Sequence, residues 1–117
     1  MGPAGASILV VEDDPSLRLV CRVNLELENF RVREAEGVAD ARAAVAAERP
    51  ALVFLDLHLG AGASDGFLEE LRADGIPVVL VSGTVDLAEY RERATAVIPK
   101  PFDPADLVAA AHRHAAS

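Results

Sequence analysis

Acidic residues in two parts of this sequence have the types and positions needed to bind a metal ion and accept a phosphoryl group. Glu12, Asp13 and Asp14 follow one apolar run, and Asp56 interrupts another in Leu55-Asp56-Leu57. A carboxylate inside an apolar run needs a partner, because an isolated buried charge is costly. Clustered carboxylates also repel one another unless a cation or a proton offsets their charge. Mg²⁺ would resolve this conflict, since it takes oxygen ligands that include one or two carboxylates.

A serine and a lysine further along the chain would complete such a site. Ser82 and Gly83 follow the apolar run at 78–81, and Lys100 ends a weaker run. Alone, a serine at a strand end usually marks a turn, and a single lysine is usually a solvated surface group. Together with Asp56 they supply a carboxylate nucleophile, a hydroxyl donor and a cation for the phosphoryl oxygens. The combination predicts phosphoryl transfer onto Asp56.

The acids after the first apolar run also have structural explanations. Asp14 stands directly before Pro15, a pair typical of a helix N-cap and the first helical residue. Glu12 and Asp13 would also be favoured near a helix N-terminus by the helix dipole. We assign Asp14 to capping and favour the metal-site interpretation for Glu12 and Asp13.

Strands alternating with helices are expected to position these residues. Continuous apolar runs at 8–11, 52–55 and 78–81 predict strands covered on both faces. Weaker strands at 30–35 and 96–100 contain charged residues or proline, which favour the edges of a sheet. Helical spacing predicts helices at 15–29, 38–48, 65–73 and 86–93, and a last helix after Pro104.

This alternation predicts an α/β fold with right-handed crossovers and helices on both faces of a parallel sheet. With the weaker strands at the edges, the strand order is 2-1-3-4-5, a flavodoxin-like, doubly wound, five-stranded sheet. Ligands of such sheets bind outside the carboxyl ends of the strands, where the order reverses. That point lies between the first and third strands, where Glu12, Asp13 and Asp56 would meet.

Composition limits the classes of protein that fit. The 117 residues suffice for a single domain, with a core at about 7–115, and a formal charge of −8 argues against binding nucleic acid or anionic lipid through charge. The single cysteine, Cys21, excludes an internal disulfide and fits a reducing compartment. The first ten residues lack a basic leader region, and no run is long enough to span a membrane. We expect a cytoplasmic protein.

Four short motifs resemble those of the response regulator receiver family of two-component systems, which includes the small chemotaxis regulator. The resemblance extends from Ile8 to about Ala110. The motifs are Val10-Val11-Glu12-Asp13-Asp14, Leu55-Asp56-Leu57, Val81-Ser82-Gly83 and Lys100-Pro101-Phe102.

The resemblance implies a role for each of these residues. Asp56 would be the phosphoacceptor in a Mg²⁺- or Mn²⁺-dependent reaction, and the protein would not be a turnover enzyme. The metal ligands would be Asp13, Asp56 and the His58 backbone carbonyl, with Glu12 acting through water. Ser82 would donate a hydrogen bond to the phosphoryl group, the small Gly83 would leave access to it, and Lys100 would pair with its charge. The resemblance also implies a cis peptide bond between Lys100 and Pro101.

The resemblance also implies partners. A sensor histidine kinase or a phosphotransfer protein would donate the phosphoryl group, and the signal would pass to an unidentified protein target. Neither nucleic acid nor a membrane would bind this domain, which would be a monomer or a weak dimer. Since only one helix follows Lys100, the sequence fits a stand-alone receiver or a receiver excised from a larger regulator or hybrid kinase.

Two departures from the family pattern concern signalling rather than the phosphoryl site. The position three residues before Lys100, often aromatic in the family, is Val97, so another element would have to report the state of the site. The stretch from Ser82 to Lys100 is short, which would trim the fourth helix. His58 and Thr84 occupy family positions linked to phosphoryl lifetime, or they merely line a solvated loop.

Two other functions use the same residues. A phosphatase of the haloacid dehalogenase type also has a strand-end aspartate nucleophile and Mg²⁺, but it usually carries a second acid where this chain has His58. A phosphorylation-independent interaction module could share the fold. The combination of Asp13, Asp56, Ser82 and Lys100 favours the receiver.

Overall fold

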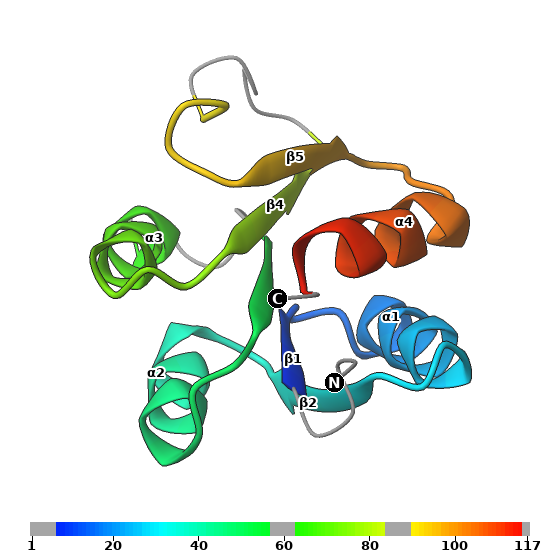
Figure 1. The fold of residues 1–117 in the computed structure, drawn as a ribbon, viewed down its shortest axis with the longest axis horizontal. Helices are drawn as coiled ribbons and strands as arrows, with labels where there is room; N and C mark the ends of the chain where they lie inside the picture. The colour runs from blue at the N-terminus through cyan, green and yellow to red at the C-terminus, as the bar shows by residue number, and fades with distance from the viewer. Residues whose placement is uncertain (1–6, 57–62, 84–89, 116–117) are drawn as a thin grey trace.

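The computed structural model describes residues 7–56, 63–83 and 90–115. Five parallel strands form one sheet in the order β2-β1-β3-β4-β5, which confirms the predicted topology (Figure 1). The strands are β1 (Ser7–Val11), β2 (Arg31–Ala35), β3 (Leu52–Asp56), β4 (Val78–Ser82) and β5 (Ala96–Pro99).

Two helices cover each face of the sheet. In Figure 1, α1 and α4 lie on one side, and α2 and α3 lie on the other. The helices are α1 (Pro15–Leu27), α2 (Val38–Ala47), α3 (Ala63–Ala73) and α4 (Pro104–His114). No helix in the described ranges is long and apolar enough to cross a membrane.

The central strands are buried on both faces, as their continuous apolar runs predict. In β1, Leu9 and Val11 pack into the core beneath α2 and α3, whereas Ile8 and Val10 pack into the core beneath α1 and α4. Successive strand residues point to opposite faces, so both sides of β1 must be apolar. The sheet therefore separates two apolar layers.

Helix α1 begins as its sequence predicts and ends earlier. The Asp14 side chain accepts hydrogen bonds from the Ser16 and Leu17 amides, at 2.9 and 3.4 Å. The predicted end at Asn29 is wrong, because the helix ends at Leu27 and Asn29 adopts a left-handed φ of 70° that turns the chain toward β2. Asparagine tolerates this conformation better than most residues.

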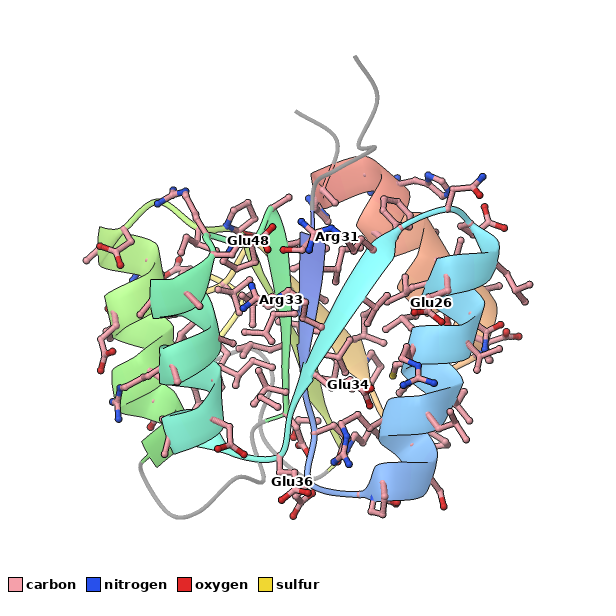
Figure 2. All side chains as sticks on the ribbon, turned by 90° about the horizontal axis from the view of Figure 1, so that it is seen from below. Glu26, Arg31, Arg33, Glu34, Glu36 and Glu48 are labelled. Atoms are coloured by element: carbon pink, nitrogen blue, oxygen red, sulfur yellow. The ribbon has the colours of Figure 1, made fainter. Side chains whose placement is uncertain are left out.

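The edge strand β2 is held by charged side chains on both sides (Figure 2). Glu34 pairs with Arg18 and Arg22 of α1, at 3.1 and 2.8 Å. On the other side, Arg31 pairs with Glu48, and Arg33 donates to the carbonyls of Ala44 and Glu48 at the end of α2. Charged side chains along an edge strand also disfavour pairing with another chain.

The connection between β4 and β5 differs from the expected helix. Of the predicted helix at 86–93, only residues 90–93 lie in the described part, and they form a turn. Tyr90 accounts for this shape: its ring is buried in the core beneath α2 and α3, and its hydroxyl donates to Asp65 at 3.0 Å. One aromatic anchor holds the connection against α3.

Candidate functional site

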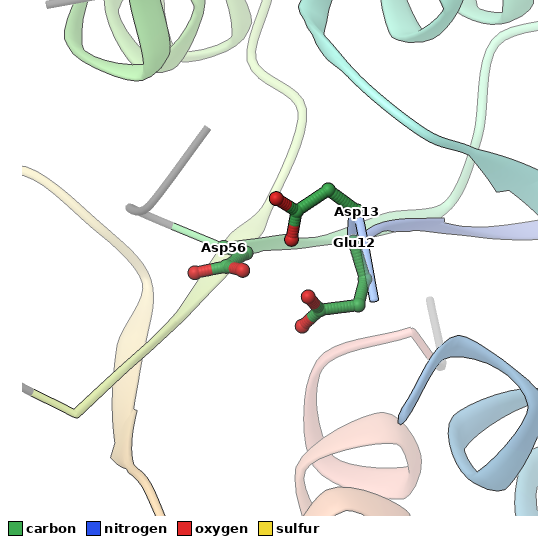
Figure 3. A group of neighbouring side chains, drawn as sticks. All are labelled: Glu12, Asp13 and Asp56. Atoms are coloured by element: carbon green, nitrogen blue, oxygen red, sulfur yellow. The ribbon is translucent and has the colours of Figure 1, made fainter. Parts of the chain in front are cut away.

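The three predicted metal ligands meet at the carboxyl ends of β1 and β3. Val11 pairs with Leu55 in the sheet, so Glu12, which follows β1, and Asp56, the last residue of β3, lie at neighbouring strand ends. Glu12, Asp13 and Asp56 each place one carboxylate oxygen within 4.8 Å of the others (Figure 3). Glu12 and Asp56 are buried, and Asp13 is exposed. Asp13 is therefore the solvent-facing member of the cluster.

Lys100 supplies the cation of the cluster. Its ammonium Nζ lies 3.1 Å from Glu12 Oε1 and 3.2 Å from Asp56 Oδ2. Burial lowers the pKa of Lys100, but the hydrogen bond to Glu12 and the charge of Asp56 outweigh burial and raise it overall. Lys100 is therefore protonated and shared by two buried carboxylates.

Glu12 has a strongly perturbed acidity. Burial, followed by the hydrogen bond with Asp56, raises the pKa of Glu12 from 4.5 to about 7. The Asp14 amide, which donates to Glu12 Oε2 at 3.1 Å, and Lys100 both oppose this rise. Near neutral pH the cluster therefore holds a proton that a divalent cation would displace.

The hydroxyl of Ser82 is unpaired among the described residues. Its Oγ is buried and has no hydrogen-bond partner. The backbone of Ser82 is well fixed, because its carbonyl accepts from the Lys100 amide at 2.8 Å. Buried polar atoms are rarely left unpaired, so the hydroxyl is suited to a ligand that the structure does not contain.

Gly83 leaves room for Lys100 as well as for access to the site. A Cβ at position 83 would lie 3.3 Å from Lys100 Cβ, which is a tight contact. The absent side chain therefore lets β5 bring Lys100 close to β4. The Lys100–Pro101 peptide bond is cis, as the resemblance implies.

Two contacts around Glu12 were not anticipated from the sequence. Arg18 donates to the Glu12 backbone carbonyl at 2.7 Å while pairing with Glu34. The Asp14 amide holds the Glu12 carboxylate, so Asp14 both caps α1 and orients a site residue. The sequence does not predict these contacts of Arg18, because they depend on how β2 is placed beside α1 in the folded protein.

The other residues singled out from the sequence fall outside this cluster. His58 and Thr84 lie outside the described residues, so their expected roles are not tested. Val97 is half-buried and packs against the core beneath α2 and α3. The side chain at the position expected for an aromatic switch is thus a small core residue.

Comparison with known proteins gives the family. A sequence model described as "Response regulator receiver domain" matches residues 8–112. The chain belongs to the response regulator receiver family. Its five-stranded parallel sheet is thus that of a two-component receiver domain.

Similar proteins include full-length regulators and isolated receiver domains. The receiver domain is 36% identical to the DNA-binding response regulator MtrA of Mycolicibacterium smegmatis, covering 87% of this chain and 47% of MtrA. It is 32% identical to the KDP operon transcriptional regulatory protein KdpE of Escherichia coli, covering 95% of this chain and 53% of KdpE. The chain therefore spans about half the length of these relatives.

Solved structures agree with the fold. The receiver domain of NtrX from Brucella abortus has a TM-score of 0.83 and 32% identity, covering 92% of this chain and 97% of that chain. A CheY-like receiver domain protein from Methanospirillum hungatei has a TM-score of 0.85 and 25% identity, covering 94% and 93%.

Proposed function

We propose that residues 7–115 work as one receiver domain that accepts a phosphoryl group on Asp56 and signals through protein contacts. One observation carries the proposal: the buried Asp56 carboxylate lies beside two further acids and the Lys100 ammonium. On the adjacent strand Asp56 pairs with Val81, and the next residue is Ser82, whose buried hydroxyl is unpaired. These are the groups that phosphoryl transfer requires, and they come from four different strand ends.

The acidic cluster fits a hard divalent cation, Mg²⁺ or Mn²⁺. Its donors are all carboxylate oxygens, and the three lie within 4.8 Å of one another. Asp13 and Asp56 would hold the ion, with Glu12 acting through water. When bound, the cation would neutralise charge on the phosphoryl oxygens. The His58 backbone carbonyl, a further ligand by the family pattern, belongs to the same proposal.

The chain's own residues divide the remaining work. An Asp56 carboxylate oxygen attacks phosphorus, and the bond between phosphorus and the donor breaks with its electron pair leaving on the donor. The Ser82 hydroxyl then donates to one phosphoryl oxygen. Lys100 already touches Asp56, so it pairs with the new phosphoryl charge by releasing Glu12. Phosphorylation would thereby remove an ion pair between β5 and the end of β1.

An exposed apolar face of α1 suits the phosphodonor protein, a histidine kinase or phosphotransfer protein. Helix α1 starts directly after the acids, and an apolar groove of about 380 Å³ beside its first turn is lined by Leu17, Lys100, Pro101 and Phe102. The face continues along the helix through Leu19, Val20, Val23 and Leu27, which are 40–74% exposed. Apolar surface that leads to the site entrance gives a donor a place to dock.

We infer that the protein is a switch rather than a turnover enzyme. The phosphoryl group is gained and later lost on Asp56 itself, so the reaction does not require a pocket that binds a substrate and releases a product. A cavity beneath the cluster, lined by Val10, Cys21, Phe54 and neighbours, has a volume of about 10 Å³. It is too small for a phosphate ester.

Intact mass after incubation with acetyl phosphate and Mg²⁺ tests the proposal. Wild type should gain one phosphoryl group, and omission of Mg²⁺ or the change Asp56→Asn should abolish the gain. Asp40→Asn, an exposed acid at the start of α2, is the matched control and should be phosphorylated like wild type. A folded wild type that never gains the mass would instead support a phosphorylation-independent module, and steady release of phosphate from esters would support a phosphatase.

A further inference from the structure

A second hollow lies at the end of the sheet opposite the acidic cluster. It has a volume of about 470 Å³ and opens between the end of α3, the start of β4, the turn before β5 and the end of α4. The volume is within the range of small-molecule sites. Its lining residues are Arg72, Gly75, Ile76, Pro77, Val78, Glu92, Arg93, Ala94, Thr95, Arg113 and His114.

The rim of this hollow is cationic although the chain carries a charge of −8. Arg72, Arg93 and Arg113 come from three different segments and all border it. Glu69 accepts from both Arg72 and Arg93, at 3.4 and 3.0 Å, and holds two guanidinium groups near one another. Glu92 is the only acid among the lining residues. The hollow therefore keeps a net positive charge.

Arg113 is the arginine of the hollow that has no partner among the described residues. It makes no hydrogen bond or ion pair with any described residue, unlike Arg72 and Arg93. His114, beside it, also has no such partner in the described ranges. The two follow each other at the end of α4, where the helix dipole stabilises cations.

The apolar floor of the hollow is formed by Pro77 and Ala94, which are half-buried, whereas Ile76 and Val78 are almost fully buried. The backbone donors of this floor are already used. The Val78 amide donates to Thr95 Oγ1 at 3.1 Å, and the Thr95 amide donates to the Val78 carbonyl at 2.9 Å. Recognition of an anion would therefore fall to the arginine side chains, and the floor would take an apolar or planar group.

We propose that this hollow binds a nucleoside phosphate, with the phosphate on Arg113 and the neighbouring arginines and the base over the apolar floor. Guanidinium groups favour phosphate because their paired N–H donors match its oxygens. A mononucleotide also fits the volume better than inorganic phosphate, which would leave the floor uncovered. The site is separate from Asp56, so it does not depend on the function proposed above.

A ¹⁵N–¹H correlation titration with AMP tests the site. Saturable shifts should appear at Ile76, Val78, Ala94 and Thr95, and Arg113→Ala should weaken binding about ten-fold or more. Arg91→Ala is the matched control, since Arg91 is an exposed arginine of the turn before β5 and does not line the hollow. It should bind AMP like wild type.

Parallel titrations with inorganic phosphate and adenosine separate the two parts of the ligand. Each should bind at least about ten-fold more weakly than AMP if both the arginines and the floor contribute. Equal binding of inorganic phosphate and AMP would overturn the nucleotide assignment. Non-saturable shifts, or equal weakening by Arg113→Ala and Arg91→Ala, would overturn the site itself. Because Asp56→Asn should leave all of these results unchanged, failure here is distinguishable from failure of phosphorylation.

Discussion

The buried Glu12 predicts a specific loss of stability as the pH rises. The residue is 4% exposed, and the pKa of its carboxyl is raised from 4.5 to about 7 by burial and by Asp56. Between these two values the folded state holds a proton that the unfolded state has released. Stability must then fall with rising pH across this window. It is fully present below about pH 4.5 and lost above about pH 7.

The size of this loss follows from the shift. A change of about 2.5 pH units corresponds to roughly 3 kcal/mol at 1.36 kcal/mol per unit. Other groups also titrate, so the useful quantity is the difference in unfolding free energy between wild type and Glu12→Gln. Glutamine keeps the shape but does not ionise. That difference should fall by roughly 3 kcal/mol from pH 4.5 to pH 7.5.

Urea denaturation of the metal-free proteins at several pH values measures this difference. Glu36→Gln, which replaces an exposed glutamate, is the control and should track wild type. Saturating Mg²⁺ at pH 7.5 should restore much of the lost stability of wild type, because the cation binds the folded state alone. A wild-type minus Glu12→Gln difference that is flat, or that rises with pH, would refute the argument that burial of Glu12 sets its acidity.

Two further perturbations separate chemistry from packing. Ser82→Ala should slow phosphorylation by acetyl phosphate, measured by intact mass, by about ten-fold. It should change the unfolding free energy by less than about 1 kcal/mol, since the hydroxyl has no partner to lose. A large loss of stability would show a hidden partner. Leu25→Ala should cost about 2–5 kcal/mol by urea denaturation because Leu25 is fully buried, whereas Leu27→Ala, at a side chain 74% exposed, should stay within about 0.5 kcal/mol; similar costs would contradict the packing of α1.

The sheet and the acidic cluster could be predicted because their signals are local. Continuous apolar runs identify central strands, and charged residues or proline identify edges, so the order and the position of the switch point follow. Once the order is known, Glu12 and Asp56 must meet, as the structure shows. The cis bond before Pro101 came from the resemblance alone.

Features set by tertiary contacts could not be predicted. Val20 fits the apolar spacing of α1 but is 40% exposed, because spacing does not tell which part of a wide apolar stripe the sheet covers. The turn at 90–93 replaced an expected helix because Tyr90 is held by the core and by Asp65. The hollow near Arg113 joins segments far apart in the chain, and no motif marks it.

The buried Tyr90 also gives the domain an intrinsic fluorescence signal. It is the single tyrosine of a chain that has no tryptophan. Emission above the phenylalanine range therefore arises from one known phenol, which joins the β4–β5 connection to α3 through Asp65. An unlabelled sample therefore carries its own spectroscopic reporter of the contact between Tyr90 and α3.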